Sequence, residues 1–193
     1  MDNSEKVFVG AAHQAKESAG EAAVVRFKAE PTEETFIDLV RLISPRMLRY
    51  FRSHGVDPAQ TEDLLQDVLV LIFQNIRSLR DTALFWAWSY KIARNVYLQH
   101  IRKSSIALRS IPIEDVVLPA KTAEPWQHGS FGAWMQRLDP VEQDVLILRF
   151  VEDMEYQEIA EALDIPIGTV KWRIFQAKKK LLKYLPQGKD EDR

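Results

Sequence analysis

The chain has no cysteine, and this absence excludes several classes of protein at once. A disulfide-stapled fold, a cysteine-ligated zinc site and a thiol enzyme all require that residue. The 193 residues include only seven glycines and no strand-length alternation of β-branched and polar residues. The apolar spacing is helical instead, which predicts an all-α protein. The length suits one large domain or two small ones.

Long apolar runs are also missing. No run is longer than the six apolar side chains of residues 68–73, whereas a transmembrane helix needs roughly 20 residues. The N-terminus carries charges of both signs and lacks the apolar core of a signal peptide. We therefore predict a cytoplasmic protein without membrane insertion.

Groups of residues that could support catalysis or hold a metal are absent as well. The four histidines are scattered, with no His-Glu-x-x-His spacing, and there is no glycine-rich phosphate loop or Gly-x-Ser-x-Gly elbow. The many carboxylates are expected on solvated helix surfaces. We predict that the protein is not an enzyme and has no catalytic residues, no metal site and no cofactor.

Apolar residues recur at helical spacing in two blocks, which predicts two small helical domains joined by a flexible linker. We expect the first domain over residues 31–103 and the second over residues 130–185. Residues 104–129 contain three prolines and no helical stripe, as expected of the linker. Residues 1–30 form an N-terminal extension, either a loose helix or a disordered tail, and residues 186–193 form a C-terminal tail.

Local signals place several helix ends. Thr32 is a predicted N-cap, with acidic residues in the first turn after it. Asp139 is a second N-cap, followed by a proline at the first helical position and by Glu142 three residues after the cap. Pro45 lies inside a helical pattern and is expected to kink or split that helix after Ser44.

The net charge of −2 hides a strong segregation of charge. Residues 57–67 carry four acids and no base, and residues 77–109 carry seven bases and one acid. In the second block, residues 139–161 carry eight acids and one base, and residues 169–185 carry six bases and no acid. A basic helix that follows a short helix and a tight turn is typical of a DNA-reading helix-turn-helix.

Residues 156–171 fit a helix-turn-helix position by position. Ala160 is small where two helices must approach closely, and Asp164 tolerates the left-handed conformation expected in the turn. Val170 and Ile174 are expected to fix the second helix against the first. An ordinary helical hairpin with a solvated lysine face is the alternative. The side chains expected to face outward, towards base edges and phosphates, are Lys171, Trp172, Arg173, Phe175, Gln176 and Lys178.

The roles of two segments of the first block stay open on composition alone. Residues 85–97 interleave aromatic rings with cations, which suits single-stranded nucleic acid, but a core helix with a wet basic side has the same pattern. Residues 62–68 combine an acidic edge with an apolar stripe. They suit either a docking surface for a basic partner or an acidic helix start.

In this order, the three segments resemble the extracytoplasmic-function group of bacterial sigma-70 family RNA polymerase sigma factors. Residues 62–68 resemble region 2.2, Phe85 to Arg102 resembles regions 2.3 and 2.4, and Leu138 to Leu185 resembles region 4. The resemblance covers about residues 33–103 and 130–185. It favours the functional interpretation of both open segments.

The resemblance implies a sigma factor that directs transcription initiation at −35 and −10 promoter elements and aids promoter melting. The implied partners are core RNA polymerase, through its β′ clamp and β subunit, promoter DNA and an anti-sigma factor. The implied polymerase contacts are Glu62, Asp63, Leu64, Gln66 and Asp67. The implied −10 DNA contacts are Arg80, Trp88, Lys91, Arg94, Asn95, Arg102 and Lys103. The implied −35 DNA contacts are Thr169, Lys171, Trp172, Arg173, Phe175, Gln176 and Lys178.

Two other functions remain as alternatives. A sigma-mimicking adaptor would bind an anti-sigma protein and no DNA, but it should lack the recognition-helix cations that this chain keeps. A free-standing helix-turn-helix repressor would need neither the acidic docking segment nor the aromatic-basic helix. The chain departs from the family at Trp172, a position often held by a small residue. This change could alter the −35 preference, or Trp172 could pack against a partner instead.

Overall fold

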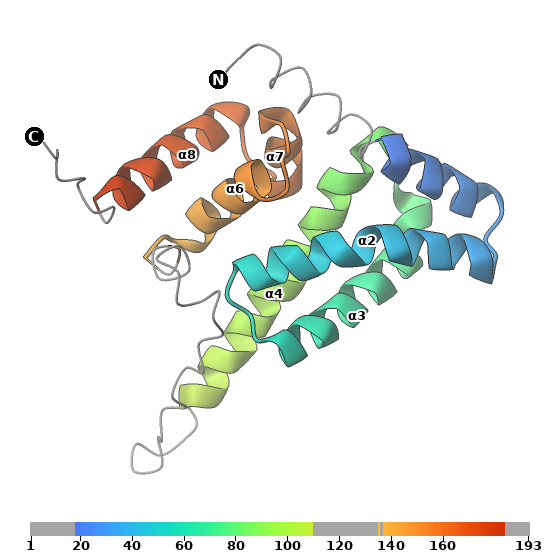
Figure 1. The fold of residues 1–193 in the computed structure, drawn as a ribbon, viewed down its shortest axis with the longest axis horizontal. Helices are drawn as coiled ribbons and strands as arrows, with labels where there is room; N and C mark the ends of the chain where they lie inside the picture. The colour runs from blue at the N-terminus through green and yellow to red at the C-terminus, as the bar shows by residue number, and fades with distance from the viewer. Residues whose placement is uncertain (1–17, 110–134, 136, 184–193) are drawn as a thin grey trace, which may run out of the picture.

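The computed structural model describes residues 18–109, 135 and 137–183, and all regular elements in these ranges are helical (Figure 1). The prediction of an all-α fold is therefore confirmed. The described part of the chain begins with a helix over residues 18–29. It continues with α2 (Glu33–Ser53), α3 (Pro58–Asn75), two 3₁₀ turns, η1 (Ile76–Ser78) and η2 (Thr82–Leu84), and the long helix α4 (Phe85–Arg109). The second domain holds α6 (Pro140–Phe150), α7 (Tyr156–Leu163) and α8 (Ile167–Leu182).

The helices form two bundles that touch. Helices α2, α3 and α4 pack against one another in the first domain, and α6, α7 and α8 do so in the second. Helix α7 also lies along α4, and α6 contacts α2, as the upper part of Figure 1 shows. The buried apolar side chains form one cluster that includes residues of both bundles. The two domains are therefore closed on each other.

The helix of residues 18–29 belongs to the first domain. Val24 and Phe27 are buried in the core. The Lys28 ammonium donates to the carbonyl oxygen of Leu79, so this helix also holds the segment between η1 and η2. Of the two alternatives for residues 1–30, residues 18–29 thus adopt a packed helix, and residues 1–17 lie outside the described residues.

The helix ends follow the local signals closely. The Thr32 hydroxyl accepts from the Thr35 N–H at 3.3 Å and caps α2. The Asp139 carboxylate accepts from the Glu142 N–H at 2.9 Å, while Glu142 accepts from the Asp139 N–H at 3.1 Å. This reciprocal pair is the capping box expected at the start of α6.

Two boundary expectations differ from the structure in part. Of the two outcomes expected at Pro45, a kink or a split, the split does not occur, because α2 is one helix from Glu33 to Ser53. Proline has no N–H to donate to the Arg41 carbonyl, but both residues are exposed, so water can donate to that carbonyl instead. Burial of the opposite face of α2 keeps the helix together. The linker expected from residue 104 starts too early because α4 continues to Arg109. Residues 110–134 and the expected C-terminal tail lie outside the described ranges.

No helix among the described residues is both long enough and apolar enough to span a bilayer.

Gly20 provides a test of the packing of the first helix. A Cβ atom added at Gly20 would collide with the indole of the buried Trp86, whereas one added at Gly168 in the first turn of α8 would meet nothing within 4 Å. We expect Gly20→Ala to lower the free energy of unfolding by about 1–3 kcal/mol, the usual cost of overpacking. Gly168→Ala should leave it unchanged or raise it by up to about 1 kcal/mol.

Urea denaturation followed by far-ultraviolet circular dichroism measures both variants. If Gly20→Ala were as stable as Gly168→Ala, the helix of residues 18–29 would not pack on Trp86.

Candidate nucleic-acid interface

The second domain contains the predicted helix-turn-helix. Asp164 ends α7 in the left-handed conformation expected of it, with φ 57° and ψ 47°. Ala160 is buried where α7 meets its neighbours, and Val170 and Ile174 are buried on α8. The turn chemistry and the inward stripe of the motif are therefore as predicted.

The outward face of α8 carries both basic and large apolar side chains. Trp172 is 53% exposed and Phe175 is 62% exposed. Lys171 and Lys178 are exposed on the same helix, and the Lys178 ammonium lies 4.5 Å from the centroid of the Phe150 ring. Thr169 and Gln176 are partly exposed. This surface offers cations for phosphates and two large rings for apolar contacts.

Unlike Lys171 and Lys178, Arg173 is held in an ion pair with an acid among the described residues. Its Nη1 lies 3.0 Å from Asp139 Oδ2, and the guanidinium also lies 5.3 Å from the centroid of the Trp172 ring. Lys180 is bound in the same way, with Nζ 2.6 Å from Glu142 Oε1. Both side chains brace α8 against the first turn of α6, so the charge of α8 that faces outward is smaller than its sequence suggests.

The predicted −10 residues lie along α4 and the segment before it. Trp88, Lys91, Asn95 and Arg102 recur at helical spacing, and all four are exposed or partly exposed on α4. Lys103 and Arg80 are exposed as well. The remaining predicted residue, Arg94, is only partly exposed, and its Nε donates to Asp144 Oδ2 at 2.8 Å. Lys91 Nζ donates to Asp164 Oδ2 at 3.2 Å.

The predicted polymerase contacts lie on α3, with one exception. Glu62, Asp63, Gln66 and Asp67 are exposed. Leu64 is only 5% exposed and belongs to the core, because it shares the inward stripe of α3 with Val68 and Ile72. The polymerase contact of Leu64 stays a prediction, and its spacing from Val68 and Ile72 already indicated a core position.

Glu152 is a buried carboxylate between the domains that the sequence did not single out. Its side chain accepts from Arg49 Nε at 2.8 Å and Arg49 Nη2 at 2.6 Å, and from the Tyr90 hydroxyl. Arg46 Nε lies 3.4 Å away, and its guanidinium stacks over the Trp86 ring at 3.8 Å from the centroid. Because Glu152 precedes α7 while these donors lie on α2 and α4, no local pattern could have shown the cluster.

Asp144 forms a second buried cluster between the domains. Its carboxylate accepts from the Tyr50 hydroxyl at 2.7 Å and from Arg94 Nε at 2.8 Å, and it lies 3.1 Å from His54 Nε2. Burial alone would raise the pKa of Asp144, but the interactions with His54, Tyr50 and Arg94 outweigh it and lower the pKa below its usual 3.8. Burial and the adjacent carboxylate raise the pKa of Tyr50 well above 10.0.

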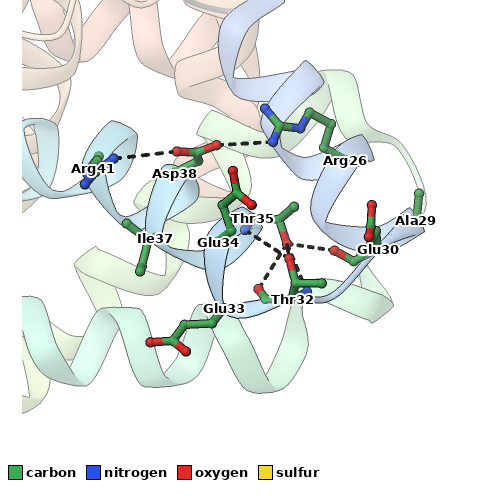
Figure 2. Close-up of a pocket in the computed structure, with 10 residues that line it drawn as sticks. All are labelled: Arg26, Ala29, Glu30, Thr32, Glu33, Glu34, Thr35, Ile37, Asp38 and Arg41. Atoms are coloured by element: carbon green, nitrogen blue, oxygen red, sulfur yellow. Dashed lines mark hydrogen bonds and ion pairs between the residues drawn. The ribbon is translucent and has the colours of Figure 1, made fainter.

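A separate surface pocket of about 690 Å³ lies where the first helix meets α2 (Figure 2). Several of its polar groups are engaged locally: Thr32 and Thr35 cap α2, and Asp38 lies 3.3 Å from Arg26 and 3.9 Å from Arg41. Within the part of the chain that the structure describes, no group of three or more His, Cys, Asp or Glu side chains is arranged to hold a metal.

Family comparisons match both domains. The model of a family described as Sigma-70 region 2 matches residues 39–106, and that of Sigma-70, region 4 matches residues 129–181. The ECF RNA polymerase sigma factor SigE of Mycolicibacterium smegmatis is 27% identical over 162 residues, which cover 80% of this chain and 63% of that protein. The ECF RNA polymerase sigma factor SigW of Bacillus subtilis is 25% identical over 169 residues, covering 79% of this chain and 90% of the relative.

Two solved structures share the fold. CnrH, in complex with the cytosolic domain of CnrY, superposes with a TM-score of 0.67 at 20% identity and covers 86% of this chain and 97% of CnrH. The sigma factor RpoE of Bartonella quintana, in complex with the anti-sigma factor NepR, gives a TM-score of 0.63 at 24% identity. The match covers 80% of this chain and 98% of RpoE.

The lowered pKa of Asp144 predicts a pH-dependent stability. Because the pKa in the folded chain is below the usual 3.8, ionised Asp144 stabilises the fold above that value, and this contribution is lost as the pH falls through the folded pKa. The difference in unfolding free energy between the native chain and Asp144→Asn should therefore be fully present at pH 6. It should shrink as the pH is lowered below about 4.

Urea titrations between pH 6 and the lowest pH at which both proteins stay folded measure this difference. The matched control is Asp63→Asn, an exposed carboxyl on α3, for which little change is expected at any pH. A difference for Asp144→Asn that did not vary with pH would contradict the assigned contacts.

Proposed function

Because this chain belongs to the extracytoplasmic-function group of the sigma-70 family, we propose that it binds core RNA polymerase and directs promoter-specific transcription initiation. The observation that carries the proposal is the occurrence of regions 2 and 4 in order along one chain. The exposed basic and aromatic face of α8 supports a DNA-reading role for region 4.

In this proposal, α8 enters the major groove of the −35 element. Lys171 and Lys178 contact phosphates, which position the helix without specifying sequence. Trp172 and Phe175 supply apolar contacts, and the C5-methyl group of thymine is the apolar feature of the major groove that they can recognise. Thr169 and Gln176 lie at the edges of the same face. Arg173 contacts the DNA while its guanidinium stays bound to Asp139.

The first domain recognises and helps to melt the −10 element. Asn95 and Trp88 lie on one face of α4, where an amide and an indole can hold an unstacked base by edge and stacking contacts. Arg80, Lys91, Arg102 and Lys103 are exposed cations along the same path and hold the backbone. Arg94 joins them once its contact with Asp144 is released.

Polymerase docks on the acidic face of α3. Glu62, Asp63, Gln66 and Asp67 are exposed there and suit a basic surface such as the β′ clamp. The polymerase supplies the bond-making chemistry, so the chain acts in the cytoplasm as a specificity factor and not as a catalyst. Since RpoE is bound by the anti-sigma factor NepR in its structure, we also propose an anti-sigma partner for this chain.

Transcription in vitro with core polymerase on a library of genomic fragments tests the function and the docking face together. The native chain should direct initiation from a small set of start sites. Asp63→Lys with Asp67→Lys should weaken binding to polymerase by about tenfold or more, because like charges then face each other. The matched control is Glu33→Lys with Glu34→Lys, which makes the same charge change at the exposed start of α2.

Start sites that did not depend on the chain would contradict the sigma factor function, and sequence-specific DNA binding without polymerase would favour a repressor. Equal polymerase affinity of the two charge-reversal variants would contradict docking on α3.

Uracil substitution tests the apolar contacts of α8. Uracil lacks only the C5-methyl group of thymine, so replacing −35 thymines one at a time should weaken binding of the native holoenzyme at the contacted positions by several-fold. Holoenzyme with Trp172→Ala should bind the promoter more weakly than native holoenzyme. At one of the contacted −35 positions it should no longer distinguish uracil from thymine. Lys178→Ala should weaken binding but keep the distinction, since it removes only a phosphate contact. An undiminished distinction in Trp172→Ala would contradict this role.

A further inference from the structure

The first helix, over residues 18–29, contacts a segment that carries one of the proposed −10 contacts. Residues 76–84, which we call the connecting segment, join α3 to α4 and include η1 and η2. Arg80 lies in the middle of this segment. We propose that Glu21 and Lys28 are positioning residues for −10 recognition, because they hold the connecting segment on both sides of Arg80. This inference rests on the proposed function, since the contact that they order is a −10 contact.

Two hydrogen bonds join the first helix to the connecting segment. The Lys28 ammonium donates to the carbonyl oxygen of Leu79, and the Thr82 hydroxyl donates to Glu21 Oε1 at 3.1 Å. Each pair has an ionised partner, which makes a hydrogen bond stronger than one between neutral groups. We call these two hydrogen bonds the tethers. They lie at residues 79 and 82 and therefore enclose Arg80 and its neighbour at residue 81.

The spacing of the tethers follows from the helix that carries them. Glu21 and Lys28 are seven residues apart, about two helical turns, so they lie on the same side of the first helix. The buried stripe of this helix, Gly20, Val24 and Phe27, runs beside them. Apolar packing thus sets the position of the helix, and the tethers extend from the edge of the packed face to the connecting segment.

Between the tethers, the backbone is fixed locally and the side chains are accessible. Leu79 is buried, and its N–H donates to the Ile76 carbonyl at 3.2 Å. The Asp81 carboxylate accepts from the Ala83 N–H at 3.1 Å and caps η2. Arg80 and Asp81 are both exposed. The tethers therefore hold the two ends of an exposed tip from which the Arg80 guanidinium can reach a phosphate.

The connecting segment leads directly into the face of α4 that we propose holds an unstacked base. Leu84 ends η2, Phe85 begins α4, and Trp88 follows within the first turn. Phe85 is buried, and its ring centroid lies 6.3 Å from that of Trp88. A fixed connecting segment gives Arg80 a defined position relative to Trp88. A phosphate and a base of the same DNA strand can then be held together.

The tethers should affect order more than stability. Lys28 is exposed, so water competes for its hydrogen bond, whereas Val24 and Phe27 already bury the first helix. Short 3₁₀ turns have poor hydrogen-bond geometry and fix a segment weakly by themselves. A backbone that is ordered before binding does not have to be ordered by the ligand, which lowers the cost of binding. Loss of a tether should therefore weaken −10 recognition and leave the fold nearly as stable.

Hydrogen–deuterium exchange in the free chain tests the tethers themselves. Lys28→Met keeps the apolar stem of the side chain and removes the donor, and Lys28→Arg keeps a donor. The matched control is Arg26→Met, because Arg26 lies on the same helix but is 3.3 Å from Asp38 of α2. A peptide covering residues 76–84 should exchange about fivefold faster in Lys28→Met than in the native chain. It should exchange at the native rate in Lys28→Arg and Arg26→Met.

The rate of open-complex formation tests the effect on Arg80. It is measured with holoenzyme on a duplex promoter mapped by transcription with the native chain. Lys28→Met and Thr82→Val should each lower this rate by about threefold or more, because the tip must then be ordered during binding. Lys28→Arg and Arg26→Met should keep the native rate. In a chain that already carries Arg80→Ala, Lys28→Met should cause no further loss, since changes that act through one contact are not additive.

Native exchange in Lys28→Met would overturn the tethers. A native rate of open-complex formation in Lys28→Met would overturn the positioning role, as would an equal loss in Arg26→Met. An equal loss from Lys28→Met with and without Arg80→Ala would also overturn it, because Lys28 would then act through the general stability of the domain. If Lys28→Met exchanged faster but polymerase with the native chain opened no promoter, the proposed function would be wrong. The positioning role that rests on it would then fall, while the two hydrogen bonds would stand.

Discussion

The closed arrangement of this protein depends on one buried carboxylate, that of Glu152. A carboxylate removed from water must be paired, and Glu152 is 2% exposed. Its partners come from Arg46, Arg49 and Tyr90, on two helices of the other domain. The same partners order the first domain, since Arg46 is itself stacked over Trp86. A single side chain between α6 and α7 thus links the DNA-reading domain to the core of the domain that contains α4.

This dependence explains which features could be read from the sequence. Thr32, Asp139 and Asp164 act on backbone groups within a few residues of themselves, so their conformations were predictable from local chemistry. The split expected as one outcome at Pro45 does not occur, because burial of one face of α2 outweighs the local cost of proline. Glu152 and Asp144 were missed because their partners are about 50 to 106 residues away in the chain, and only the tertiary fold brings them together.

The contacts in the folded chain change the meaning of the charge pattern. The acidic segment of residues 139–161 suits a surface for partners, but several of its carboxylates are used inside the molecule. Asp139 and Glu142 hold cations of α8, and Asp144 and Glu152 hold cations of the first domain. Charge counted along a sequence therefore overstates what a folded chain offers to DNA. The outward face of α8 combines its remaining cations with Trp172 and Phe175, which favours recognition by shape and apolar contact in addition to charge.

Holding the cations proposed to bind DNA by carboxylates has a consequence for specificity. An apolar contact between the domains would bury the same surface whatever ligand was nearby, whereas an ion pair is weakened by any anion that competes for the cation. Promoter DNA is a dense array of such anions once polymerase holds it close to α4. In the proposed complex with promoter DNA, Arg94 and Lys91 exchange the carboxylates of Asp144 and Asp164 for phosphates with little change in the number of charged contacts. The free-energy difference between the two sets of contacts is therefore small for these two cations.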